Sequence, residues 1–127
     1  MRRSEKKILV VDDGGPVVVL CLHVLQTLGH AVKGAPGAEA ALALIEKEPF
    51  DLIVVDYKMP HMNGFEFLEQ ARQISPALRS ILITGQGTRD VVTAATTHGV
   101  DAVLLKPFTS NELRETAEQV LARPGPS

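Results

Sequence analysis

The sequence predicts a small α/β domain built on a doubly wound, five-stranded parallel sheet with five helices. Short apolar runs alternate with stretches of helical periodicity, and turn-forming residues separate them along the whole chain. Strands that alternate with helices imply right-handed crossovers, which place helices on both faces of a parallel sheet. A length of 127 residues, 45% of them hydrophobic, suits one domain with a sizeable core. We expect that domain over residues 1–123, with 124–127 as a C-terminal tail or linker stub.

Five apolar runs are the expected strands. The central run, Leu52 to Val55, is continuously apolar up to Asp56, as is typical of a strand buried on both faces. The other four strands are expected over residues 8–11, 31–33, 80–84 and 102–105.

Five further stretches are the expected helices. Pro16 fits the first turn of the first helix, and Gly29 and Gly99 end the first and fourth helices. Thr109 and Glu112 have the spacing of a capping box at the start of the last helix. The helices are expected over residues 16–28, 38–47, 65–74, 88–98 and from the Thr109 cap to about 122.

The composition argues against several classes of function. The chain has 13 basic and 15 acidic residues, four Phe, one Tyr and no Trp, so it lacks the basic, aromatic-interleaved surface of a nucleic-acid binder. The basic start is followed by an apolar run too short for a signal peptide or a membrane span, so we expect a cytoplasmic protein with no membrane contact. The single Cys21 lies in an apolar run, which favours a core thiol.

Polar residues stand where four of the apolar strands end. They are Asp12 and Asp13 after the first strand, Asp56 at the end of the third, Thr84 at the end of the fourth and Lys106 after the fifth. Ligands of doubly wound sheets bind beyond the carboxyl ends of the strands, so these side chains are expected to share one site. Three converging carboxylates repel one another unless a divalent cation holds them, and an all-oxygen set favours magnesium or manganese over zinc.

The same five residues suit phosphoryl chemistry. A lysine and a threonine hydroxyl beside a bound cation can contact a phosphoryl group. Asp56 is the acid isolated on the middle strand, which makes it the candidate nucleophile for an aspartyl phosphate.

In these motifs the chain resembles the receiver domain of two-component response regulators, of the chemotaxis-regulator type. The resemblance covers nearly the whole chain. It is carried by Val10-Val11-Asp12-Asp13, Asp56-Tyr57-Lys58-Met59-Pro60 with Asn63-Gly64, Ile83-Thr84-Gly85 and Lys106-Pro107-Phe108. It implies a flavodoxin-like sheet with strand order 2-1-3-4-5.

The resemblance also implies roles for single residues. Asp56 would accept a phosphoryl group from a histidine kinase or a phosphotransfer protein, without the chain being an enzyme toward outside substrates. Asp13, Asp56 and the backbone carbonyl of Lys58 would bind Mg²⁺ directly, and Asp12 through water. Thr84 would act as the switch hydroxyl, and Lys106 would contact the phosphoryl group.

Further expectations follow from the same resemblance. The Lys106–Pro107 bond would be cis. The partners would be the phosphoryl donor and an output domain or output protein, with a homodimer as a further form.

Two positions depart from the family pattern. Gly14 stands where the family often has Glu or another polar residue, which removes a charge from the loop beside the metal. Val103 stands where the family often has Tyr or Phe, so the ring that moves inward with the threonine is missing. The signal is then expected to pass through Thr84, the 85–87 loop and the helix after it.

Three alternative functions stay open at this point. A phosphatase with an aspartate nucleophile would place a second Asp two residues after the first as a general acid, but Lys58 occupies that position. Gly85 and Gly87 hint at a dinucleotide-binding loop, yet the third glycine is absent and the loop follows the fourth strand. A receiver-like module that binds a partner without phosphorylation is the remaining alternative.

Overall fold

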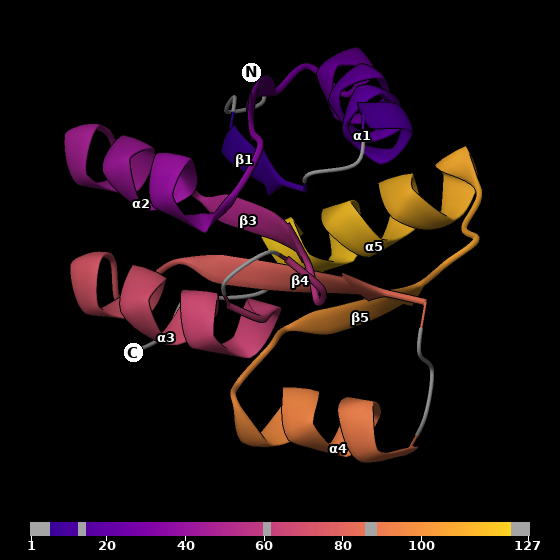
Figure 1. The fold of residues 1–127 in the computed structure, drawn as a ribbon. Helices are drawn as coiled ribbons and strands as arrows, with labels where there is room; N and C mark the ends of the chain where they lie inside the picture. Colours follow the sequence, from indigo (N-terminus) through magenta and orange to yellow (C-terminus); the bar gives the residue numbers. More distant parts are fainter. Residues whose placement is uncertain (1–5, 13–14, 60–61, 86–88, 123–127) are drawn as a thin grey trace.

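The computed structural model describes residues 6–12, 15–59, 62–85 and 89–122, and it shows strands alternating with helices as predicted (Figure 1). The elements are β1 (Lys7–Val11), α1 (Gly15–Thr27), β2 (Ala31–Ala35), α2 (Ala38–Lys47), β3 (Leu52–Asp56), α3 (Gly64–Ile74), β4 (Arg79–Thr84), α4 (Arg89–Thr97), β5 (Ala102–Leu105) and α5 (Ser110–Ala122).

The strands form one parallel sheet with the order β2-β1-β3-β4-β5, which confirms the predicted fold class. Every residue of β3 is buried, as its unbroken apolar sequence predicts for the central strand. Strand order reverses between β1 and β3, the position at which ligands of doubly wound sheets bind.

Helices cover both faces of the sheet and divide the core into two layers (Figure 1). One layer packs β-strand side chains against α1 and α5, and it contains Cys21, Leu25 and Leu113. The other packs the opposite face against α2, α3 and α4, and it contains Phe67, Leu68 and Ala95. Burial raises the pKa of the Cys21 thiol to about 12, with a smaller contribution from the negative charge of Asp12, so the thiol stays protonated at neutral pH.

Several boundaries differ from the sequence prediction by one or two residues. β2 extends to Ala35 instead of ending at Lys33, because the backbone of Gly34 and Ala35 continues the parallel pairing with β1. The glycine had suggested a loop, but Gly34 pairs with Val10 of β1, and a Cβ there would lie 3.2 Å from Val18 of α1. α3 begins at Gly64, and α4 runs over Arg89–Thr97; the predicted Thr88 cap lies outside the described residues.

The predicted helix ends carry the expected chemistry. Gly29 and Gly99 have φ values of 91° and 74°, the left-handed backbone that glycine adopts without steric cost. At the start of α5 the Thr109 hydroxyl accepts from the Glu112 N–H at 3.0 Å, and the Glu112 carboxylate accepts from the Thr109 N–H at 2.8 Å. This reciprocal pair confirms the predicted capping box.

An ion cluster ties the end of α2 to β1 and β2. It lies away from the carboxyl ends of the strands. The Glu48 carboxylate accepts hydrogen bonds from Lys33, at 2.6 Å, and from Lys7. These two bonds, that from Lys33 first, lower the pKa of Glu48. The sequence did not predict this cluster, because its members are far apart in the chain.

Candidate functional site

The predicted site residues that the structure describes meet at the carboxyl edge of the sheet. Val11 is paired with Val55, so Asp12 and Asp56 occupy equivalent positions on adjacent strands. Asp56 is paired with Ile83, which places Thr84 one step further along β4. Lys106 directly follows β5, and its N–H donates to the Thr84 carbonyl at 2.9 Å.

Asp56 and Lys106 form an ion pair across this edge. The Lys106 ammonium Nζ lies 2.9 Å from Asp56 Oδ2, although the two residues are 50 positions apart in the chain. The Asp56 side chain is 9% exposed and that of Lys106 is 33% exposed. A carboxylate so far removed from water needs a charged partner, and Lys106 supplies one. The second carboxylate oxygen, Oδ1, accepts a long bond of 3.4 Å from the Lys58 N–H.

The remaining acids and the threonine surround this pair. Asp12 is 4% exposed, and its N–H donates to the Ala35 carbonyl at 3.1 Å. Thr84 is 1% exposed at the end of β4. Asp13, predicted as a direct metal ligand, lies outside the described residues, as does Gly14.

The residues present fit a magnesium ion. Two buried carboxylates from adjacent strands provide oxygen donors, the type that Mg²⁺ prefers, and one ammonium does not balance two buried negative charges. The predicted role of the Lys58 carbonyl as a metal ligand stays a prediction; the Lys58 contact that the structure shows is the long N–H bond to Asp56 Oδ1. No group of three His, Cys, Asp or Glu side chains assembles within the described residues, a set that excludes Asp13.

Main-chain hydrogen bonds hold Tyr57 and Gly64, the described residues next to Asp56 and at the start of α3, and Gly64 lies close to the backbone of Asp56 and Tyr57. The Tyr57 N–H donates to the Ile83 carbonyl at 2.8 Å, and the Gly64 N–H donates to the Tyr57 carbonyl at 2.8 Å. A Cβ at Gly64 would lie 3.1 Å from the Asp56 carbonyl and 2.8 Å from Leu82 Cδ1. Only glycine fits this approach, so Gly64 constrains the backbone directly after Asp56.

Asn63 starts α3 with a capping box that the sequence prediction had assigned only to a turn. The Asn63 side chain accepts from the Glu66 N–H at 3.0 Å, and the Glu66 carboxylate accepts from the Asn63 N–H at 2.9 Å. The Asn-x-x-Glu spacing was the available signal, since Asn is among the preferred N-cap residues.

The Lys106–Pro107 peptide bond is cis, as the resemblance implied. It turns the chain from β5 toward α5 directly after the lysine that pairs with Asp56.

A row of aromatic rings runs from Tyr57, next to Asp56, to the end of α4. The Tyr57 and Phe65 rings are tilted at 59° with centroids 5.3 Å apart, and the Phe65 and His98 rings stack with centroids 4.5 Å apart. Aromatic pairs at such distances attract one another beyond the area they bury. Tyr57 follows Asp56 directly, so this row joins the predicted phosphorylation site to the C-terminal end of α4.

Arg72 of α3 binds the backbone at the C-terminal end of α4. Its guanidinium donates to the His98 carbonyl, to the Gly99 carbonyl at 2.6 Å and to the Ser80 hydroxyl at 3.3 Å. A cationic donor at the carbonyl end of a helix is favoured by the helix dipole as well as by the hydrogen bonds.

Comparison with known proteins identifies the family. A family model described as the response regulator receiver domain matches residues 8–118. The sporulation initiation phosphotransferase F of Bacillus subtilis is 31% identical over 116 residues, which cover 91% of this chain and 94% of that protein. A crystal structure of a CheY-like receiver domain protein from Methanospirillum hungatei superimposes with a TM-score of 0.86 at 34% identity, covering 93% of this chain and 94% of that one.

The chain belongs to the response regulator receiver domain family, a class of two-component signalling proteins that typically depends on Mg²⁺ and is not a class of classical enzymes. This excludes the phosphatase and the dinucleotide-binding domain considered above. The family also occurs inside longer proteins. The virulence sensor protein BvgS of Bordetella bronchiseptica is 34% identical over 124 residues, which cover 92% of this chain and 10% of that protein. In the described part of this chain, no helix has the length and apolar character needed to cross a bilayer.

Proposed function

We propose that this receiver domain accepts a phosphoryl group on Asp56 from a histidine kinase or a histidine-containing phosphotransfer protein, and that Thr84 and Lys106 convert the modification into altered partner binding. The observation that carries the proposal is the 2.9 Å pair between Lys106 Nζ and Asp56 Oδ2 beside the buried Asp12. The cytoplasmic location and the boundary of the domain at residue 123 belong to the same proposal.

The chemistry follows from what Asp56 and its neighbours can do. A carboxylate oxygen of Asp56 attacks the phosphorus, the new P–O bond forms as the P–N bond to the donor histidine breaks, and the released imidazole takes a proton from solvent. Lys106 already lies beside the carboxylate and can move its ammonium onto the incoming phosphoryl oxygens. The Thr84 hydroxyl can donate to the same oxygens from the end of the next strand.

The metal ion would be held by Asp13, Asp56 and the Lys58 carbonyl, with Asp12 acting through water. When bound, magnesium or manganese supplies positive charge that offsets the charge on the phosphoryl oxygens. The aspartyl phosphate adds about 1.5 to 2 negative charges where Asp56 carried one. The Thr84 and Lys106 side chains respond to that charge and draw the loop after β4 inward.

Treatment with acetyl phosphate and Mg²⁺ is expected to add one phosphoryl group to Asp56 without any kinase. Beryllofluoride with Mg²⁺ is expected to occupy the same carboxylate. Intact mass spectrometry and a magnesium titration measure both results. The Asp56→Asn variant is the control and should stay unmodified.

Equal labelling of Asp56→Asn would refute the assignment, and so would labelling that survives a chelator. A folded protein that remains unmodified under all conditions, yet binds a signalling partner, would support the phosphorylation-independent module instead.

The lifetime of the phosphoryl group is expected to depend on Lys58. Lys58 lies two residues after Asp56, is exposed, and carries a cation long enough to reach the phosphoryl group and obstruct the hydrolytic water. The phosphoryl group should therefore persist longer in the natural protein than in Lys58→Asn, as measured by phosphate release after removal of the donor. Lys47→Asn, at the exposed end of α2, is the matched control. Equal decay in all three proteins would remove Lys58 from the mechanism.

A further inference from the structure

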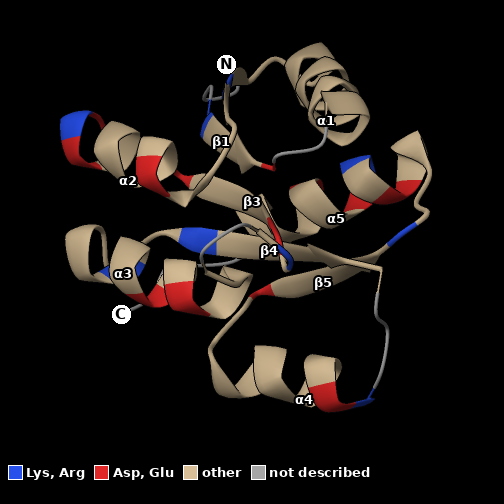
Figure 2. Cartoon of the chain, viewed as in Figure 1, with Lys and Arg blue, Asp and Glu red and all other residues tan. Residues whose placement is uncertain are grey.

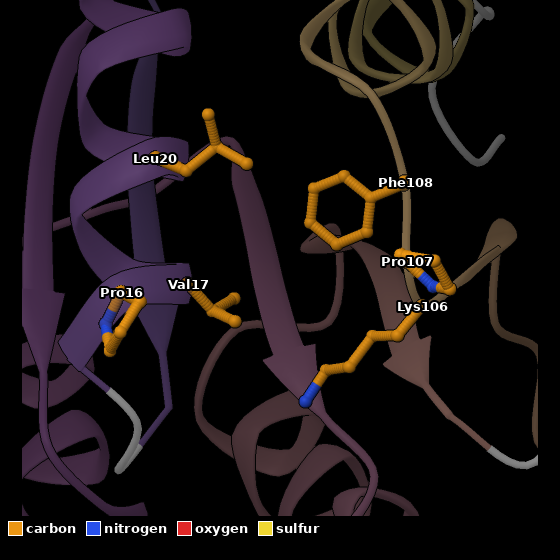
Figure 3. A pocket seen from close by; sticks show the side chains of 6 residues that line it. All are labelled: Pro16, Val17, Leu20, Lys106, Pro107 and Phe108. Carbon is orange, nitrogen blue, oxygen red and sulfur yellow. The ribbon is translucent and has the colours of Figure 1, made fainter.

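A pocket of about 500 Å³ opens between the start of α1 and the segment that follows β5 (Figure 3). The α1 wall consists of Pro16, Val17 and Leu20, and the opposite wall consists of Lys106, Pro107 and Phe108. The two walls are about 90 positions apart in the chain, so the pocket itself is formed by the fold. Pockets of about 300–1,000 Å³ with mostly apolar walls are typical of small-molecule sites.

The walls of the pocket are apolar except at one position. Val17, Leu20 and Phe108 are half-buried and pack onto the core layer beneath α1 and α5, so the core supports the apolar walls of the pocket. Figure 3 shows Leu20 and Phe108 facing each other, and the Lys106 side chain extending from the Pro107 side to the tip of the strand that lies between the two walls. The only charged group among the six lining residues is the Lys106 ammonium.

Two positive features lie at the Lys106 end of the pocket, and two buried carboxylates, Asp12 and Asp56, lie beyond it. α1 carries no Lys, Arg, Asp or Glu, so its side chains do not neutralise the positive end of the helix dipole near Pro16 and Val17 (Figure 2). The Lys106 side chain lines the pocket and is 33% exposed, whereas the Asp56 side chain beside it is 9% exposed. Asp56 and the buried Asp12 repel additional negative charge, which favours a ligand with one negative charge over a dianion.

We propose that this pocket binds a small amphipathic carboxylate. The apolar body of the ligand lies between Leu20 and Phe108, and its carboxylate accepts a hydrogen bond from Lys106. The site is distinct from the phosphoacceptor carboxylate but shares its lysine.

Sharing Lys106 couples the two sites. The ammonium cannot satisfy the ligand carboxylate and a phosphoryl group on Asp56 with equal strength, and the two anions repel each other. Binding of the carboxylate therefore opposes modification of Asp56, and modification weakens binding of the carboxylate by the same factor. This coupling rests on the proposed function, whereas binding to the unmodified protein does not.

Octanoate and octanamide are the probes for the site. They differ in the charged head and share the apolar body, so their affinities separate charge recognition from hydrophobic burial. Amide chemical shifts of the unmodified, ¹⁵N-labelled chain should respond to octanoate at residues 17–20 and at Lys106 and Phe108. Octanamide is expected to bind about tenfold more weakly or worse, because it lacks the charge-assisted bond to Lys106.

Two substitutions on the same helix form a matched pair. Val17→Asp places a carboxylate in the wall of the pocket and should abolish octanoate binding by repulsion. Val19→Asp adds the same charge to a residue that is 65% exposed and does not line the pocket, and should leave binding close to that of the natural chain. The octanoate and octanamide comparison in the natural chain needs no variant, so it decides the proposal even where Val17→Asp does not fold.

Several outcomes would overturn the proposal. Equal shifts with octanoate and octanamide would remove Lys106 from recognition, and shifts scattered over the surface would remove the pocket. If the amides of residues 17–20, Lys106 and Phe108 respond to protein concentration, or to a histidine-bearing helical partner, but not to octanoate, the pocket would be assigned to a second copy or to that partner.

Beryllofluoride tests the coupling separately. Occupancy of Asp56 should lower octanoate affinity by about tenfold, whereas unchanged affinity at full occupancy would refute the coupling. Failure of beryllofluoride to bind would count against the proposed function alone, since octanoate binding to the untreated chain still decides the pocket.

Discussion

Replacing Gly64 with alanine is expected to lower the free energy of unfolding by about 1–3 kcal/mol. The added methyl group would lie 2.8 Å from Leu82 Cδ1, 3.1 Å from the Asp56 carbonyl and 3.2 Å from Tyr57 Cα. Leu82 is fully buried in the sheet, and the other two contacts are main chain, so neither side can yield without a shift of the loop or of β4. The same shift would displace the carboxylate that the loop presents, so phosphorylation by acetyl phosphate should also slow.

Urea denaturation measures the stability change, and Gly15→Ala is the matched control. A Cβ at Gly15, the first residue of α1, would meet nothing within 4 Å. Alanine there should leave the free energy of unfolding within about 0.5 kcal/mol of the natural chain. If Gly64→Ala is as stable as Gly15→Ala and is phosphorylated at the natural rate, the close contact at Gly64 does not constrain the loop.

The residues at the strand ends could be predicted from the sequence because topology alone brings them together. Asp12, Asp56, Thr84 and Lys106 each end or follow an apolar run, and parallel strands joined by right-handed crossovers all point the same way. Their convergence therefore requires no knowledge of side-chain packing. The 2.9 Å approach of Lys106 to Asp56 is a detail that this topology permits but does not specify.

The features that the sequence did not predict depend on contacts between distant elements. Gly64 looked like an ordinary turn residue, and its crowding comes from Leu82 on β4. Arg72 looked like an exposed helix residue, and its role comes from the two carbonyls that end α4. The strand at residues 34–35 was missed because glycine has a low strand propensity, which pairing with β1 overrides.

Phosphorylation of Asp56 is expected to change partner affinity through the α4–β5–α5 surface by a modest factor, because Val103 replaces the usual ring. Val103 is half-buried on β5 and packs against the core layer beneath α4. A β-branched side chain is stiff at its first torsion and has no large movement between buried and exposed positions. The free energy of coupling between Asp56 and that surface should lie near the low end of about 1–3 kcal/mol.

The anchoring of α4 also favours a modest effect of phosphorylation on the α4–β5–α5 surface. Arg72 holds the His98 and Gly99 carbonyls, and the His98 ring stacks on Phe65, so the C-terminal end of α4 is fixed to α3. Movement drawn inward by Thr84 must then be absorbed at the start of α4, next to the loop after β4. The signal should stay close to the site instead of spreading over the helix.

Amide chemical shifts with and without beryllofluoride measure this spread. In the natural chain, the changes should be confined to the strand-end site and the 85–88 loop, and partner affinity should change by about fivefold. Val103→Tyr supplies the missing ring and should extend the changes into residues 102–116, with a larger affinity change. The Asp56→Asn substitution, made in the natural chain and in Val103→Tyr, is the negative control. Large changes over residues 102–116 in the natural chain would show that the signal reaches the surface without an aromatic ring at position 103, and that neither Val103 nor the anchored end of α4 limits the switch.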